Sequence, residues 1–169
     1  MTTGMLDRLD RQPAWRFLAI LYLARWALLL PLSWLIGLLA AGGAAAGAPA
    51  PAPVFDSLEQ AAEAFLQWVV LWPVVETLFE CTLAYELLRR LPRYACGLPR
   101  RPWLFLVVSA ALMAALHPVL SALLPSLITG AFLAYTYSRF APVGRVRAVL
   151  ASAGFHGAIN LVGWLSVAV

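Results

Sequence analysis

The sequence predicts an all-α membrane protein, a polytopic transmembrane helical bundle of about five spans with a cytoplasmic N-terminus. Hydrophobic residues make up 63% of the 169 residues, whereas soluble domains usually contain about 45–50%. Charged residues make up only 12%, and the mean hydropathy is +0.83. Apolar side chains that face lipid need no burial against protein, so a bilayer accommodates this composition better than water does.

The first apolar run covers residues 15–41 and follows a polar N-terminal segment, residues 1–14. At about 1.5 Å per residue, such a run can cross a hydrocarbon core of about 30 Å. It is longer than the apolar part of a signal peptide, which predicts a retained helix. Residues 42–57 form an Ala/Gly/Pro linker, and Ser57 with Gln60 fits the start of a second helix.

Residues 58–169 are predicted to form the helical core that carries the remaining spans. The predicted spans are residues 58–88, 102–120, 121–140 and 148–169. Pro73 lies inside the first of these and is expected to kink it. Pro118 and Pro125 predict a tight reversal between the next two spans.

The arginines support this division, because they fall in clusters that the five spans place on one side of the membrane. These are Arg8, Arg11, Arg16, Arg89, Arg90, Arg93, Arg100, Arg101, Arg139, Arg145 and Arg147. By the positive-inside rule, this side is cytoplasmic. The same clustering is typical of membrane topology and gives no indication of a nucleic-acid partner.

Four ionisable residues interrupt the predicted spans, namely Glu76, Glu80, His117 and His156, and Asn160 lies beside them. Each such group costs about 2.5–3.5 kcal/mol on insertion, so a chain keeps it for internal pairing or for function. Counted from the cytoplasmic ends at about 1.5 Å per residue, Glu76, His117 and Asn160 lie at similar depths of about 20–22 Å. The sequence therefore predicts a polar layer built by three helices.

The spacing of these residues adds a second constraint. Glu76 and Glu80 are four residues apart, as are His156 and Asn160. Residues four apart share a helical face, so each pair is able to point into one cavity.

This set of side chains suits the activation of water. A carboxylate removed from water is a stronger base, imidazoles orient water or relay protons, and an amide stabilises an oxyanion. Glu76, His117 and His156 also resemble a catalytic zinc set, which makes a divalent metal such as zinc a possible cofactor. No His-Glu-x-x-His helix is present.

Structural roles are open for the same residues. Glu80 is a candidate ion-pair partner for Arg25, which interrupts the first apolar run. His117 precedes Pro118 and has the option of bonding a freed backbone carbonyl. Asn160 is a candidate interhelical hydrogen-bond donor.

At these positions the sequence resembles the CPBP family, the CAAX-protease and bacteriocin-processing (Abi-like) intramembrane proteases. The family's Glu-Glu-x-x-x-Arg motif is represented with Thr77 in place of the second Glu and Cys81 in place of the Arg. Its Phe-x-x-x-His motif is represented with Met113 in place of the Phe. The matching segments are PVVETLFEC at 73–81, MAALH at 113–117, GAFLAYTYSR at 130–139 and HGAIN at 156–160.

The resemblance implies a role for each matched residue. Glu76 would activate the attacking water, and His117 and His156 would hold or polarise it. Asn160 would support the water or the oxyanion. Glu80 has no place in the family motif and is a candidate substitute for the missing acid one turn on.

The resemblance therefore predicts an endopeptidase of the bacterial inner membrane that cleaves a protein or peptide substrate in or near the lipid. Two alternatives stay open. The departures at Thr77 and Cys81 suit a catalytically silent membrane scaffold or immunity-type factor. A small transporter is the other, although five spans carry no inverted repeat.

Overall fold

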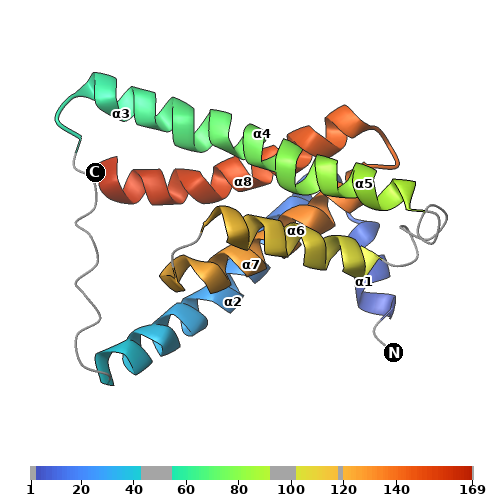
Figure 1. Ribbon diagram of the computed structural model, residues 1–169, viewed down its shortest axis with the longest axis horizontal. Helices are drawn as coiled ribbons and strands as arrows, with labels where there is room; N and C mark the ends of the chain where they lie inside the picture. Colours follow the sequence, from blue (N-terminus) through green and yellow to red (C-terminus); the bar gives the residue numbers. More distant parts are fainter. Residues whose placement is uncertain (1–2, 43–54, 92–101, 118–119, 169) are drawn as a thin grey trace.

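The protein is an all-α helical bundle, which confirms the predicted fold class (Figure 1). The computed structural model describes residues 3–42, 55–91, 102–117 and 120–168, and none of these residues forms a strand. The helices are α1 (Thr3–Asp10), α2 (Ala14–Gly42), α3 (Leu58–Phe65), η1 (Leu66–Leu71), α4 (Trp72–Glu76), η2 (Thr77–Leu83), α5 (Ala84–Arg90), α6 (Pro102–Leu116), α7 (Leu120–Phe140) and α8 (Arg145–Ala168).

The boundaries differ from the sequence prediction in two places. Helix α1 forms within the segment that was predicted only to be polar. Pro125 lies inside α7, so the predicted reversal does not extend to it. Most of the predicted linker falls in 43–54, outside the described residues. The division into an N-terminal span and a core at 58–169 stays a prediction.

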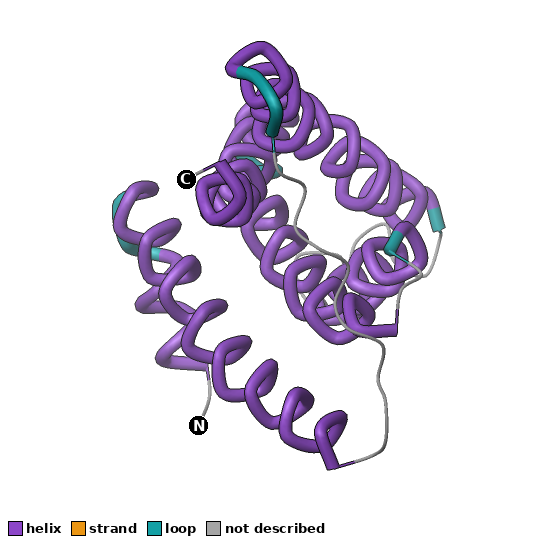
Figure 2. The backbone as a smooth tube through the Cα atoms, turned by 90° about the vertical axis from the view of Figure 1, so that its left-hand side faces the viewer, coloured by secondary structure: helices purple, strands orange, loops and turns teal. Residues whose placement is uncertain are grey.

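The elements from α3 to α5 form one continuous helical run, which lies beside α8 (Figure 1). Helix α6 packs on α7, and α7 packs on α8. Helix α2 contacts α7 and α8, and it runs along one side of the molecule in Figure 2. The buried interior between α6, α7 and the long run contains Phe105, Leu133 and Tyr137.

Glycine allows the helices in this bundle to approach closely. A Cβ atom at Gly130 of α7 would lie 2.8 Å from Ala110 Cα and 2.8 Å from Met113 Cβ, both on α6. The hydrophobic effect hardly drives helices together in lipid, which is itself apolar. Small residues let the backbones come close, so that van der Waals packing stabilises the contact.

Within the described residues, three helical segments have the length and apolar composition needed to cross a membrane, namely Ala14–Leu35, Leu58–Arg90 and Arg145–Ser166. A shorter apolar helix covers Trp103–Leu116. Large apolar side chains such as Trp34 (69% exposed) lie on the outside of the bundle, where lipid would cover them. The protein therefore associates with a membrane, while the count of five spans stays a prediction.

Arginine-bearing segments that are far apart in sequence meet at one end of the bundle. Arg139, near the end of α7, donates a hydrogen bond of 3.1 Å to the Leu9 carbonyl, and its guanidinium lies 4.2 Å from the Phe17 ring centroid. Arg145, the first residue of α8, forms an ion pair of 2.6 Å with Glu86 of α5. This clustering matches the distribution on which the positive-inside prediction rests.

Candidate functional site

The site begins with Pro73, because a proline removes one backbone donor from the long helical run. In an α-helix the N–H of residue 73 would bond the Val69 carbonyl, and in a π-helix it would bond the Trp68 carbonyl. Proline has no N–H, so neither carbonyl receives that bond. The run has π-helical geometry on both sides of α4, in η1 and η2. Single π-helical turns are rare and often lie at functional sites.

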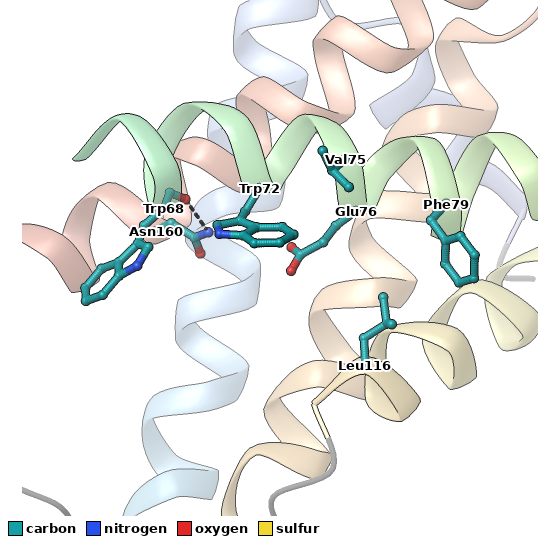
Figure 3. A pocket seen from close by; sticks show the side chains of 7 residues that line it. All are labelled: Trp68, Trp72, Val75, Glu76, Phe79, Leu116 and Asn160. Carbon is teal, nitrogen blue, oxygen red and sulfur yellow. Dashed lines mark hydrogen bonds between the residues drawn. The ribbon is translucent and has the colours of Figure 1, made fainter. Parts of the chain in front are cut away.

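Helix α8 approaches the run at these two carbonyls. A Cβ atom at Gly157 would lie 2.5 Å from the Val69 carbonyl oxygen, so only glycine fits at this distance. Asn160 Nδ2 donates a hydrogen bond of 2.9 Å to the Trp68 carbonyl (Figure 3). Asn160 therefore forms the interhelical hydrogen bond that the sequence left open as its structural role.

Glu76 is the acidic centre of the site, and its side chain is only 17% exposed. Its Oε2 atom lies 3.4 Å from His156 Nδ1, and its Oε1 atom lies 3.9 Å from His117 Nε2. Both separations are below 4 Å, and Nδ1 of His156 has no hydrogen-bond partner among the described residues. The carboxylate is thus held between two imidazoles that come from α8 and from the end of α6.

The backbone at the end of α6 orients His117. Its backbone N–H bonds the Ala114 carbonyl at 3.2 Å, as in a 3₁₀ turn. The Met113 carbonyl is therefore left for the His117 ring, whose Nδ1 lies 2.9 Å away. A carbonyl only accepts, so Nδ1 of His117 carries a proton and donates it to this carbonyl, while Nε2 faces Glu76. His117 thus has both the backbone role and the site role that its sequence position allowed.

Four of the five catalytic candidates line two neighbouring spaces. A polar cavity of about 170 Å³ contains Glu76, both histidines and Asn160. A larger groove of about 590 Å³ shares Glu76 and Asn160 with this cavity, and Figure 3 shows the Glu76 carboxylate pointing into it. The other residues that line the groove are Trp68, Trp72, Val75, Phe79 and Leu116.

Glu80 lines neither the cavity nor the groove. Its side chain is fully buried within η2, and the hydroxyl of Ser109 donates a 2.9 Å hydrogen bond to its backbone carbonyl. The helix passes from α-helical to π-helical geometry between Glu76 and Glu80, and only Glu76 lines the cavity and the groove. Among the described residues Glu80 forms no ion pair with Arg25, whose Nε bonds Thr129 instead.

Thr77 and Cys81, the two departures from the family motif, are both fully buried. Neither lines the cavity or the groove. The sequence analysis did not place Arg25 of α2 or Ser126 and Thr129 of α7 in this cavity, which all three line. The signal in the sequence was a charged residue, Arg25, inside an apolar run. The sequence could not show which residue its side chain contacts or towards which helix it points.

The predicted metal site finds no support in the described part of the chain. There, no three His, Cys, Asp or Glu side chains are grouped so that they could hold a metal ion. Although Glu76, His117 and His156 are neighbours, they do not form such a group, and a zinc ion stays a prediction.

An Asn160→Ala variant is expected to destabilise the protein by about 1–3 kcal/mol, because the Trp68 carbonyl loses its donor and lipid offers no replacement. Pro73→Ala supplies a new N–H to the same region, so the double variant should recover at least about 1 kcal/mol of that loss. The measurement is a double-mutant cycle: thermal unfolding in detergent of the parent, Asn160→Ala, Pro73→Ala and the double variant. Strictly additive losses would show that Asn160 does not compensate for Pro73.

No protein-family model, curated protein or solved structure matches this chain. The chemistry of the cavity therefore has to be inferred from its own side chains.

Proposed function

We propose that the protein hydrolyses peptide bonds at the membrane, with Glu76 as the base that activates water. The observation that carries this proposal is the Glu76 carboxylate between two imidazole nitrogens at 3.4 and 3.9 Å. A general base needs a place for water within hydrogen-bond reach, and the 3.9 Å separation from His117 Nε2 leaves room for a bridging molecule.

The proposed reaction needs no group beyond these side chains. Glu76 takes a proton from water while the water oxygen bonds to the carbonyl carbon. His117 Nε2 accepts a hydrogen bond from the same water and fixes its direction. When the carbon–nitrogen bond breaks, protonated Glu76 returns the proton to the leaving amine. His156, which is 3% exposed, limits the rotation of the carboxylate from the other side.

The groove supports an apolar peptide as the substrate class. Its lining is mostly aromatic and aliphatic, and Glu76 is its acidic group. Trp68 is 36% and Trp72 is 52% exposed, so an apolar segment is able to lie against them while its backbone reaches Glu76. Such a peptide would come from the bilayer or from its surface.

The resemblance to CPBP proteases is part of this proposal, as is a multi-pass location in a bacterial inner membrane with the N-terminus inside. The ordered motif segments and the arginine-rich end of the bundle support it. The alternative of a silent scaffold rests on Thr77 and Cys81. Since neither side chain lines the cavity or the groove, their replacement leaves the groups around Glu76 unchanged, which favours hydrolysis.

The test is cleavage of a membrane-tethered apolar peptide by the purified, reconstituted protein in water enriched in ¹⁸O. We expect one ¹⁸O atom in the new carboxylate, as water attack requires, and no cleavage by Glu76→Ala. Equal cleavage by both proteins would exclude Glu76 as the base. No cleavage by either, across a library of tethered peptides, would favour the silent scaffold.

A further inference from the structure

Arg25 places a buried cation in the polar cavity. It belongs to the candidate span Ala14–Leu35 and is only 6% exposed. Its Nε donates a hydrogen bond of 3.1 Å to Thr129 Oγ1, and its guanidinium lies 4.9 Å from the Trp26 ring centroid. A charge at such a position is costly in a membrane, which makes it a candidate functional residue.

Part of this guanidinium lacks a protein partner among the described residues. The Nη1 atom of Arg25 is buried and has no hydrogen-bond partner among the residues that the structure describes. Arg25 lines the same cavity of about 170 Å³ as Glu76, His117 and His156. An unpaired charged donor of this kind is strongly attracted to an anion, because little water screens it.

Asn160, the residue expected to support an oxyanion, has part of its amide engaged elsewhere. Its Nδ2 atom donates to the Trp68 carbonyl at 2.9 Å. The Trp68 carbonyl has no alternative donor in Pro73, so this bond also holds the helical run to α8. Arg25 Nη1 therefore has no competing hydrogen bond among the described residues, whereas Asn160 Nδ2 already donates one.

We propose that Arg25 binds the oxyanion that forms when water attacks the peptide carbonyl, an inference that rests on the hydrolysis proposed above. As the water oxygen bonds to the carbonyl carbon, the electron pair of the C=O double bond moves to oxygen, and Glu76 takes the water proton. When the carbon–nitrogen bond breaks, that pair re-forms the double bond, and the proton passes to the amine. One water is consumed, and an acid and an amine are released.

Charge balance in the cavity favours an oxyanion as the ligand of Arg25 over a carboxylate group of the substrate. Before attack, the negative charge is on Glu76. After attack, Glu76 is neutral and the negative charge is on the carbonyl oxygen, so the cavity keeps one anion opposite Arg25. A substrate carboxylate would add a second anion beside Glu76, and the two would repel each other. Arg25 therefore acts in the transition state more than in the ground state.

The kinetic test compares Arg25→Gln with the parent in the cleavage assay. We expect kcat to fall about 10²–10³-fold, as for loss of an oxyanion donor, while KM changes less than about threefold. Arg25→Lys keeps the charge and should retain about tenfold more activity than Arg25→Gln. Arg16→Gln is the matched control, because Arg16 lies on the same helix, exposed, over the Trp15 ring.

A binding test needs no turnover. The probes are monomethyl butylphosphonate, a tetrahedral anion, and its neutral dimethyl ester, titrated calorimetrically into the full chain in detergent. We expect the parent to bind the anion at least about tenfold more tightly than the ester, and Arg25→Gln to lose this preference. Glu76→Gln should keep or increase it, because it removes a like charge.

The outcomes separate this proposal from the proposed hydrolysis. An Arg25-dependent preference for the anion in a protein that cleaves no peptide supports the anion site and overturns the hydrolysis. An active parent whose Arg25→Gln variant keeps its kcat, or whose KM alone rises, overturns the role of Arg25. Loss of anion preference together with unfolding of both Arg25 variants would also count against it, because Arg25 would then be structural.

Discussion

Glu76→Gln is expected to lower kcat by about 10²–10⁴-fold, the range that a general base contributes. Glutamine keeps the size and hydrogen-bonding shape of the side chain but does not accept a proton from water. Cleavage of a tethered peptide, measured with the reconstituted variant over a range of substrate concentrations, provides kcat and KM separately. We expect KM to change little, since the apolar groove is unaltered.

Glu63→Gln is the matched control for this variant. Glu63 lies on the same helical run, is exposed, and accepts a hydrogen bond of 3.1 Å from Gln67. Its replacement should leave kcat unchanged. The thermal midpoint of Glu76→Gln should equal or exceed that of the parent, because the variant no longer buries a charge. Full activity in Glu76→Gln, with a folded protein, would contradict the assignment of the base.

Gly157→Ala is expected to destabilise the protein by about 1–3 kcal/mol, the usual cost of overpacking. The new Cβ would lie 2.5 Å from the Val69 carbonyl oxygen, which belongs to backbone and has little freedom to move. The helices must separate, and Asn160 and His156 on either side of Gly157 would move away from Trp68 and Glu76. We therefore expect activity to fall along with the midpoint of thermal unfolding.

Two other glycines of α8 serve as controls. A Cβ at Gly154 or at Gly163 meets nothing within 4 Å. Alanine is favoured over glycine in a helix by about 1 kcal/mol, so both substitutions should be neutral or stabilising. If Gly157→Ala were as stable as Gly154→Ala, the close approach of α8 to the helical run would be incorrect.

The general fold was predictable from the sequence because lipid imposes a simple requirement. A spanning segment must be apolar and must satisfy its own backbone, so helices and their approximate positions follow from hydropathy. The sequence also indicated that Glu76 and His117 lie at one depth, because depth depends on counting along a helix from its end. That Glu76 lies within 4 Å of both histidines required the packing of three separate helices.

The direction in which a side chain points around the helix axis was less predictable than its depth in the membrane. The spacing of Glu76 and Glu80 indicated one shared face, but this assumes a regular α-helix. The helix is π-helical on both sides of α4, and Glu80 is buried and does not line the cavity. A local sequence pattern cannot show how a helix accommodates a missing donor when the compensating group, Asn160, lies on another helix.

The sequence by itself determined that this is a helical membrane protein with a costly set of polar residues, because composition and spacing along one helix suffice for both. Only the tertiary structure decided which of these residues meet. It brought Arg25 from α2 into the cavity, placed Glu80 outside it, and engaged Asn160 with a backbone carbonyl. The physical reason is that contacts between helices depend on close approach at positions such as Gly157, and on donors supplied across the interface.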